Sequence, residues 1–202
     1  MPQISVVDYG VGNLRSVKRG LEKSGANVLV THNSDDLDKS DAIVFPGVGA
    51  FAPAIKNLDA LSDMVRQWAA NGKPILGICL GLQLLFTKSS EGGSLKGLDL
   101  IPGEVVKLPS CVKTPQMGWN TIDIVQSHPL LDGVENGSYV YFVHSYISQP
   151  TEPNVIVACT EYGVRFPSIV AKRNLLATQF HPEKSSHTGS VILRNFIEFL
   201  KR

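Results

Sequence analysis

Short apolar runs alternate with amphipathic stretches along the first half of the chain. The runs are almost uninterrupted, a pattern typical of strands that are buried on both faces of a parallel sheet. They occupy residues 4–8, 27–30, 41–45 and 74–78. After the first run, Leu14, Val17 and Leu21 recur at helical spacing. Asn13 is a suitable N-cap for this helix, and Gly25 is a suitable stop.

Further helices are predicted between the later runs. Ser34 can cap a short helix, residues 58–70 have helical periodicity, and residues 80–86 form an apolar helix after the fourth run. Strands that alternate with helices in this way predict an α/β fold with a doubly wound, mostly parallel sheet.

The pattern changes between residues 98 and 170, where short strand-like segments separated by turns replace the helical periods. This region predicts an antiparallel extension of the parallel sheet. Residues 175–180 return to a buried strand, and a closing helix is predicted from Ser190 to the end. Neither a repeat nor a linker interrupts the chain, so we expect one domain over residues 1–202.

Composition excludes several classes of function. The chain has 202 residues, 43% of them hydrophobic, and a net charge of +1 with scattered basic residues. We therefore expect no nucleic-acid binding. No run reaches the roughly 18 apolar residues of a membrane span, and residues 1–3 lack the features of a signal peptide. We expect no membrane association.

The cysteine and glycine patterns bear on compartment and cofactors. Cys79, Cys111 and Cys159 are odd in number and lack metal-type spacing, so we expect no metal and a reducing compartment, by default the cytoplasm. Gly10 and Gly12 supply only half of a dinucleotide-binding fingerprint, so no cofactor is expected.

Candidate chemistry lies in residues 77–81, Gly-Ile-Cys-Leu-Gly, directly after an apolar run. Gly-x-Cys-x-Gly is the thiol form of the nucleophile elbow, a strained strand-to-helix turn that exposes its central side chain. The flanking glycines are required because a Cβ on either side would clash. The following helix N-terminus favours a thiolate at Cys79, and the Leu80 N–H can donate to a developing oxyanion.

A base and an acid follow about a hundred residues later as His181-Pro182-Glu183. In an extended segment, His181 and Glu183 point to the same side, and Pro182 disfavours a helix interior. A histidine oriented by a carboxylate is the arrangement that activates a cysteine nucleophile.

The motifs at residues 77–83 and 179–183 resemble those of the class I, Cys-His-Glu glutamine amidotransferases. Four further segments, together with Lys184, resemble one branch of that family, the glutaminase subunits of imidazole glycerol phosphate synthase. These segments are Asp-Tyr-Gly-Val-Gly-Asn at 8–13, Pro-Gly-Val-Gly at 46–49, Gln-Met-Gly-Trp-Asn at 116–120 and Tyr-Phe-Val-His-Ser-Tyr at 141–146. The resemblance runs from the first strand to the last helix and implies a class I glutamine amidotransferase-like fold.

The resemblance implies hydrolysis of the glutamine side-chain amide through a Cys79 thioester, with proton transfer by His181. It also implies that the Val48 N–H joins Leu80 in the oxyanion hole. Glycines on both sides of Val48 leave its peptide free to flip, so we expect the hole to form only in an activated state. Around the glutamine, the resemblance places Gly47, Gly49, Gln83, Ser145 and Tyr146.

The same resemblance implies a partner. Ammonia is mostly protonated in neutral water, and no part of the 202 residues is left for a second active site. The expected acceptor is a cyclase subunit with a (β/α)₈ barrel, in a heterodimer that makes imidazole glycerol phosphate and aminoimidazole carboxamide ribotide for histidine biosynthesis. Candidates for the docking face are Asn13, Met117, Trp119, Tyr141 and Lys184.

Several alternatives stay open from the residues alone. Trp119 could be a core residue, and His144 is a rival base, although it alternates with apolar residues and lacks a neighbouring acid. The chain could instead serve a different amidotransferase, be a catalytically silent partner-binding domain, or be a cysteine peptidase or DJ-1-like thiol protein.

Overall fold

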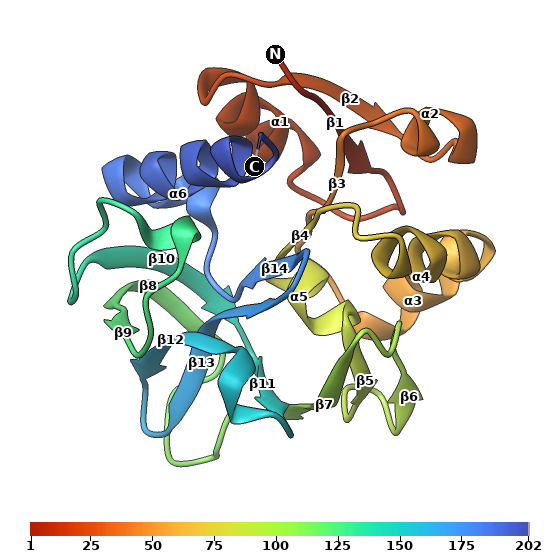
Figure 1. Cartoon of the computed structure of the whole chain (residues 1–202). Coiled ribbons are helices and arrows are strands. Elements are labelled where there is room, and N and C mark those ends of the chain that lie inside the picture. The colour runs from red at the N-terminus through yellow and green to blue at the C-terminus, as the bar shows by residue number, and fades with distance from the viewer. Residues whose placement is uncertain (202) are drawn as a thin grey trace.

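The computed structural model describes residues 1–201 and centres on an eight-stranded sheet (Figure 1). Five adjacent strands run parallel in the order β2-β1-β3-β4-β14. Their bounds are β1 Gln3–Val7, β2 Asn27–Thr31, β3 Ala42–Phe45, β4 Ile75–Ile78 and β14 Leu175–Thr178. The sheet continues antiparallel through β13 (Arg165–Lys172), β12 (Ile156–Glu161) and β9 (Asp123–Ile124). The predicted fold class is confirmed.

Helices cover both faces of the parallel part of the sheet (Figure 1). On one face lie α1 (Leu14–Lys23) and α6 (Ser186–Phe199), whose buried side chains share a core with β1, β3 and β4. On the other lie α2 (Ser34–Asp38), α3 (Phe51–Asn57), α4 (Ser62–Ala70) and α5 (Leu80–Leu84). Strands β1, β3, β4 and β14 are buried on both sides, which explains their uninterrupted apolar runs, whereas the edge strand β2 is partly exposed.

Two smaller, mostly antiparallel sheets complete the fold. The first pairs β8 (Gln116–Thr121) with β10 (Tyr139–His144). The second has the order β11-β7-β5-β6, formed by Tyr146–Pro150, Ile101–Lys107, Phe86–Ser89 and Leu95–Lys96. Short 3₁₀ turns link these elements: η1 Asp59–Leu61, η2 Pro129–Leu131, η3 Pro153–Val155 and η4 Pro182–Lys184.

Several predicted helix boundaries are wrong. The helix predicted over 58–70 is divided into η1 and α4, and the helix predicted over 80–86 ends at Leu84, because β5 begins at Phe86. Helix α3 was not predicted. It contains Pro53 in its first turn, where a missing N–H costs no hydrogen bond.

Two predicted helix starts are also displaced. The N-cap of α2 is Asn33 rather than Ser34, since its side chain accepts from the Asp35 N–H at 2.8 Å. The closing helix α6 begins at Ser186 rather than Ser190.

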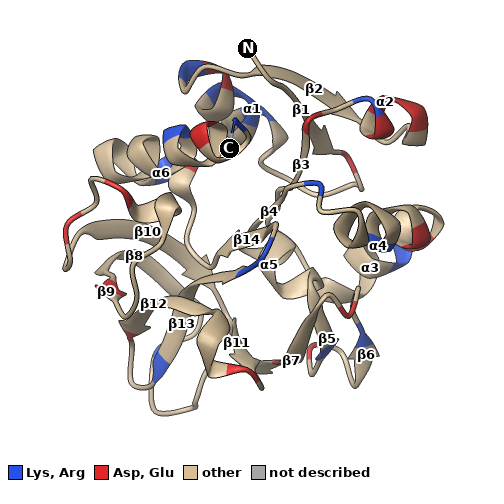
Figure 2. Ribbon diagram, viewed as in Figure 1, with Lys and Arg blue, Asp and Glu red and all other residues tan. Residues whose placement is uncertain are grey.

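Charge and membrane propensity add little to this picture. Acidic and basic residues are mixed over the helices, whereas β8 and β10 carry no charged residue (Figure 2). Within residues 1–201, no helix combines the length and the apolar character that crossing a bilayer requires.

Candidate active site

Cys79 lies between β4 and α5 in a strained backbone conformation, with φ 53° and ψ −101°. A non-glycine residue adopts such angles only where its surroundings impose them. A Cβ on Gly77 would lie 2.7 Å from the Gly81 carbonyl oxygen, and a Cβ on Gly81 would lie 2.0 Å from the Phe45 carbonyl oxygen. Both flanking positions therefore require glycine, as the elbow motif predicts.

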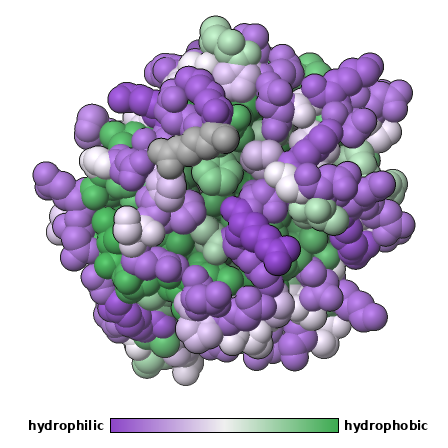
Figure 3. Space-filling model, in the orientation of Figure 1, coloured by the Kyte–Doolittle hydropathy of each residue, from purple (hydrophilic) through white to green (hydrophobic). Residues whose placement is uncertain are grey.

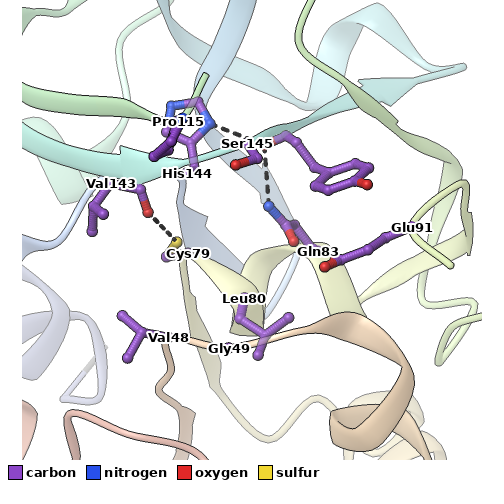
Figure 4. A pocket seen from close by; sticks show the side chains of 11 residues that line it. Val48, Gly49, Cys79, Leu80, Gln83, Glu91, Pro115, Val143, His144 and Ser145 are labelled. Carbon is purple, nitrogen blue, oxygen red and sulfur yellow. Dashed lines mark hydrogen bonds between the residues drawn. The ribbon is translucent and has the colours of Figure 1, made fainter. Parts of the chain in front are cut away.

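The Cys79 sulfur is buried between two polar groups. Its thiol lies within hydrogen-bonding reach of the Val143 carbonyl oxygen at 3.7 Å (Figure 4). The Gln179 side-chain amide approaches the same sulfur at 3.7 Å and can donate to it. The site thus has an acceptor for a thiol and a donor for a thiolate. Gln179 was not predicted as a site residue.

His181 and Glu183 form a buried pair. The Nδ1 atom of His181 lies 2.7 Å from Glu183 Oε1, and both side chains are fully buried. The segment is not extended as predicted: residues 182–184 form η4, and this tight turn brings the carboxylate back to the ring. The opposite ring atom, Nε2, has no hydrogen-bond partner among residues 1–201. Glu183 therefore holds Nδ1, and Nε2 is available for proton transfer.

The charge state of His181 reflects competing effects. Burial lowers the pKa of His181, but the neighbouring Cys79 thiol and Glu183 carboxylate outweigh it and raise the pKa to about 10. The imidazolium form is therefore favoured at neutral pH.

Asn13 contacts this pair, which its sequence position did not indicate. It occupies the N-cap position of α1, but its side chain caps no helix N–H, so the predicted capping role is wrong. Its amide lies 2.5 Å from Glu183 Oε1 and 3.5 Å from His181 Nδ1. The side chain is used to hold the carboxylate instead.

Residues 46–49, here called the glycine turn, follow β3 and lie beside the elbow. Gly47 and Gly49 have φ values of +148° and +149°, which favour glycine. A Cβ on Gly47 would lie 3.5 Å from the Leu80 Cβ, so the turn packs against the residue that follows the nucleophile. This proximity brings together the two residues predicted to supply oxyanion donors, Val48 and Leu80.

A pocket of about 240 Å³ opens at Cys79 (Figure 4). It is smaller than the about 300–1,000 Å³ typical of pockets for drug-sized ligands. Its lining includes Val48, Leu80 and most residues predicted to bind glutamine, namely Gly49, Gln83, Ser145 and Tyr146. Gly47, His181 and Glu183 are not part of the lining.

Gln83 and Glu91 lie across the pocket from the Cys79 sulfur (Figure 4). Gln83 is buried and donates to the Tyr146 carbonyl oxygen at 3.1 Å. Glu91 was missed in the sequence, where it is one acidic residue in a glycine-rich loop. Its carboxylate accepts from the Phe51 N–H at 3.1 Å. Burial raises the pKa of Glu91, and this hydrogen bond partly offsets the rise.

The contacts of His144, the rival base, indicate a structural role. Its ring nitrogens lie 3.0 Å from the Tyr146 carbonyl oxygen and 3.0 Å from Gln116 Oε1. Burial lowers the pKa of His144 to about 4. A neutral ring donates from only one nitrogen, and both nitrogens face these protein oxygens, so His144 is poorly suited to take a proton from Cys79.

The β8–β10 sheet presents an aromatic face to solvent. We define the aromatic face as Met117, Trp119, Tyr139 and Tyr141, alternate residues on one side of the two strands. Met117 is 65% exposed, Trp119 52% and Tyr139 62%, and the Trp119 and Tyr141 rings meet edge to face. Trp119 is therefore not a core residue. Lys184 lies 5.9 Å above the Tyr141 ring. Hydrophobic side chains gather at the lower left of the space-filling view, over the antiparallel strands (Figure 3).

The backbone of β10 joins the aromatic face to the candidate catalytic residues. The Tyr141 carbonyl accepts from the His181 N–H at 2.9 Å, and the Val143 carbonyl faces the Cys79 sulfur. The Tyr139 and Tyr141 side chains of the same strand belong to the aromatic face. A displacement of β10 would therefore reach both His181 and Cys79.

Comparison with known proteins agrees with this geometry. The sequence model of "Glutamine amidotransferase class-I" matches residues 5–199. The chain belongs to the class I glutamine amidotransferase family. Among relatives in this family, "Imidazole glycerol phosphate synthase subunit HisH" of Methanosarcina acetivorans is 50% identical, covering 98% of this chain and 99% of its own. The protein of that name from Archaeoglobus fulgidus is 49% identical, covering 98% of this chain and 100% of its own.

Solved structures show the class I glutamine amidotransferase fold at much lower sequence identity. The structure titled "Structure of PurLQS from Thermotoga maritima" matches with a TM-score of 0.78 at 19% identity, covering 98% of this chain and 99% of that one. One titled "Crystal structure of glutamine amidotransferase" matches with a TM-score of 0.77 at 18% identity, with the same coverage.

Proposed function

We propose that this chain is a glutaminase, which hydrolyses the side-chain amide of glutamine to glutamate and ammonia. The observation that carries the proposal is the buried Cys79 at the head of a small pocket, backed by the 2.7 Å His181–Glu183 pair. The Cys79 thiolate attacks the amide carbon, and His181 gives its proton to the leaving ammonia. Water then hydrolyses the thioester. Glu183 orients the imidazole and stabilises its charge, and Asn13 holds Glu183 in place.

The developing oxyanion requires donors on one side of Cys79. We assign these to the Leu80 N–H, which follows the nucleophile, and to the Val48 N–H of the adjacent glycine turn. Loss of one such donor typically raises the barrier by about 2.7–4 kcal/mol. The conformation of the glycine turn would therefore control the rate.

The far end of the pocket suits the amino-acid end of glutamine. The Glu91 carboxylate is positioned to attract the α-ammonium group, with Gln83, Ser145 and Tyr146 as polar neighbours. Gly49 leaves the pocket open beside them, and Gly47 supports the turn from behind. These assignments predict selectivity for a free α-amino acid over an amide lacking the charged end.

We further propose that the ammonia is used by a cyclase subunit in histidine biosynthesis. The names of the relatives support this, since each is called a subunit of imidazole glycerol phosphate synthase. The proposed partner is a (β/α)₈ barrel that forms a heterodimer through the aromatic face. Exposed aromatic side chains are frequent anchors of such interfaces. Asn13 and Lys184 would lie at its edge.

Docking at the aromatic face would affect catalysis through β10, because its carbonyl groups contact His181 and Cys79. The cytoplasm is the compartment that we propose, because a cysteine nucleophile and two further free cysteines suit reducing conditions.

The test is glutamate release from glutamine by this chain, alone and then with the cyclase subunit and its nucleotide ligand. We expect slow release alone, faster release in the full mixture, and loss of both in Cys79→Ala. If the full mixture releases no glutamate above the Cys79→Ala background, the assignment to this synthase is wrong. If release occurs and the cyclase subunit does not change it, a different acceptor is indicated.

A further inference from the structure

Two hydrogen bonds tie the glycine turn to the loop that follows β1. The Tyr9 hydroxyl donates to the Pro46 carbonyl oxygen, and the Gly12 N–H donates to the Val48 carbonyl oxygen at 3.4 Å. The loop packs closely as well, since a Cβ on Gly12 would lie 2.9 Å from the Val48 Cγ2. The turn is therefore held at both ends by one neighbouring loop.

The two bonds fix the peptides on either side of the Gly47–Val48 peptide. That central peptide carries the Val48 N–H, the donor proposed for the oxyanion. A peptide flip changes ψ of the residue before it and φ of the residue after it, and leaves the flanking peptides in place. With Pro46 and Val48 carbonyls anchored, rotation is confined to Gly47 and Val48, where glycine at φ +148° permits it.

Tyr9 is built into the core as a neutral donor. Its ring is buried and contacts Phe45 at 6.1 Å between centroids. Its backbone carbonyl accepts from the Asn57 side-chain amide at 2.9 Å, which fixes the start of the loop. Burial and the nearby Cys79 raise the pKa of Tyr9 well above its ordinary value, so the hydroxyl keeps its proton. The neutral hydroxyl is therefore available to donate to the Pro46 carbonyl oxygen.

We propose that Tyr9 is a positioning residue for the oxyanion hole, anchoring the glycine turn through Pro46 so that the Val48 N–H can face the oxyanion next to Leu80. The Gly12 N–H provides the second anchor. This inference rests on the proposed glutaminase function. Tyr9 does not line the substrate pocket, and its hydroxyl donates to the turn, so we expect its effect to be exerted through the turn.

The variant Tyr9→Phe removes the hydroxyl and keeps the ring. Tyr162→Phe is the matched control, because the Tyr162 hydroxyl donates to the Lys113 carbonyl oxygen at 2.9 Å in an exposed region. Glutamate release is measured over a range of glutamine concentrations with the cyclase subunit and its nucleotide ligand present. We expect Tyr9→Phe to lower kcat by about 10-fold, less than direct loss of a donor, with KM within about twofold. Tyr162→Phe should match the wild type.

Alkylation of Cys79 by iodoacetamide supplies the second readout. This substitution at a saturated carbon forms no oxyanion, so it depends on the Cys79 thiolate and not on the hole. We expect Tyr9→Phe to be alkylated at the wild-type rate. An equal fall in kcat and in alkylation rate would overturn the inference, because Tyr9 would then act on the nucleophile or on the fold as a whole.

Gly12→Ala provides a test that does not disturb the core, because Gly12 is exposed and its φ is not in the left-handed region. The added Cβ displaces the Val48 side chain and should lower kcat with alkylation unchanged. The Gly12→Ala variant therefore tests the inference even if Tyr9→Phe does not fold. Wild-type kcat in Tyr9→Phe, or in Gly12→Ala where Tyr9→Phe is unfolded, would overturn this inference alone. No glutamate release by the wild type would overturn the proposed function and this inference together.

Discussion

The elbow and the glycine turn follow neighbouring parallel strands and both depend on glycine, yet they are held in different ways. Phe45 and Gly77 are paired across β3 and β4, so the two turns leave the sheet at the same edge. At the elbow, a Cβ on Gly81 would be 2.0 Å from a backbone oxygen. At the glycine turn, a Cβ on Gly49 would make only an ordinary contact, 3.8 Å from Leu80 Cδ2.

This difference separates two requirements of acyl transfer. The nucleophile has to be held in one strained position, and close packing on every side achieves this. The proposed second oxyanion donor would be switched, and a turn that is anchored by hydrogen bonds and has space beside Gly49 would allow this. Glycine is required at the elbow for space and at the turn for its backbone angles.

Gly81→Ala should have the largest effect, because it attacks the packing of the elbow directly. The clash is with backbone atoms of β3, which cannot move without disrupting the central sheet. We expect a loss of about 4–5 kcal/mol or more in the free energy of unfolding. Urea unfolding followed by circular dichroism measures it. A variant of near-native stability would show that the elbow is as adaptable as the turn.

Glu183→Gln removes the negative charge that pairs with His181, the base proposed to serve the Cys79 elbow. We expect kcat for glutamate release to fall by about 10²–10⁴-fold, because His181 loses the carboxylate that orients it. The raised pKa of His181 contributes stability that is complete below about pH 6.5 and is lost as the pH rises to about 10. Unfolding midpoints across this range should decline less in Glu183→Gln than in the wild type. Parallel declines would contradict the role assigned to Glu183.

Gly49→Ala tests the glycine turn at a position with space for a methyl group. The strain of φ +149° in alanine should cost about 1–3 kcal/mol of stability and leave the chain folded. We expect kcat to fall by roughly tenfold or more, because the altered backbone misdirects the Val48 N–H. Kinetics and urea unfolding of the same preparation separate the two effects. Unchanged kcat would show that the conformation of the turn does not limit the reaction.

Trp119→Ala should have the smallest effect on the isolated chain. The side chain is 52% exposed, so we expect stability to change by less than about 0.5 kcal/mol. Basal glutamate release should also be unchanged, whereas affinity for the cyclase subunit falls by about 2 kcal/mol. Isothermal titration calorimetry measures the affinity. Unchanged affinity would place the partner elsewhere and leave both turns without a link to the aromatic face.

Much of this protein can be predicted from local sequence alone. The apolar runs predicted the parallel strands because burial on both faces leaves no polar alternation. The glycines around Cys79 predicted the elbow from their spacing, although the steric demand at Gly81 comes from Phe45 on β3. His181 and Glu183 are separated by one residue, so their pairing is also nearly local.

Contacts between distant segments were decided only in the tertiary structure. The Asn13 side chain had a plausible local use as a helix cap, but Glu183, far along the chain, offers it a charged partner. Glu91 belongs to no motif, and the segment at 8–13 gave Tyr9 no role of its own; their places at the pocket and beside the glycine turn follow from how the loops pack. The sequence by itself determined the residues that meet local steric and hydrogen-bonding demands. The tertiary structure decided which polar groups found partners across the fold, because many side chains compete for each buried donor and acceptor.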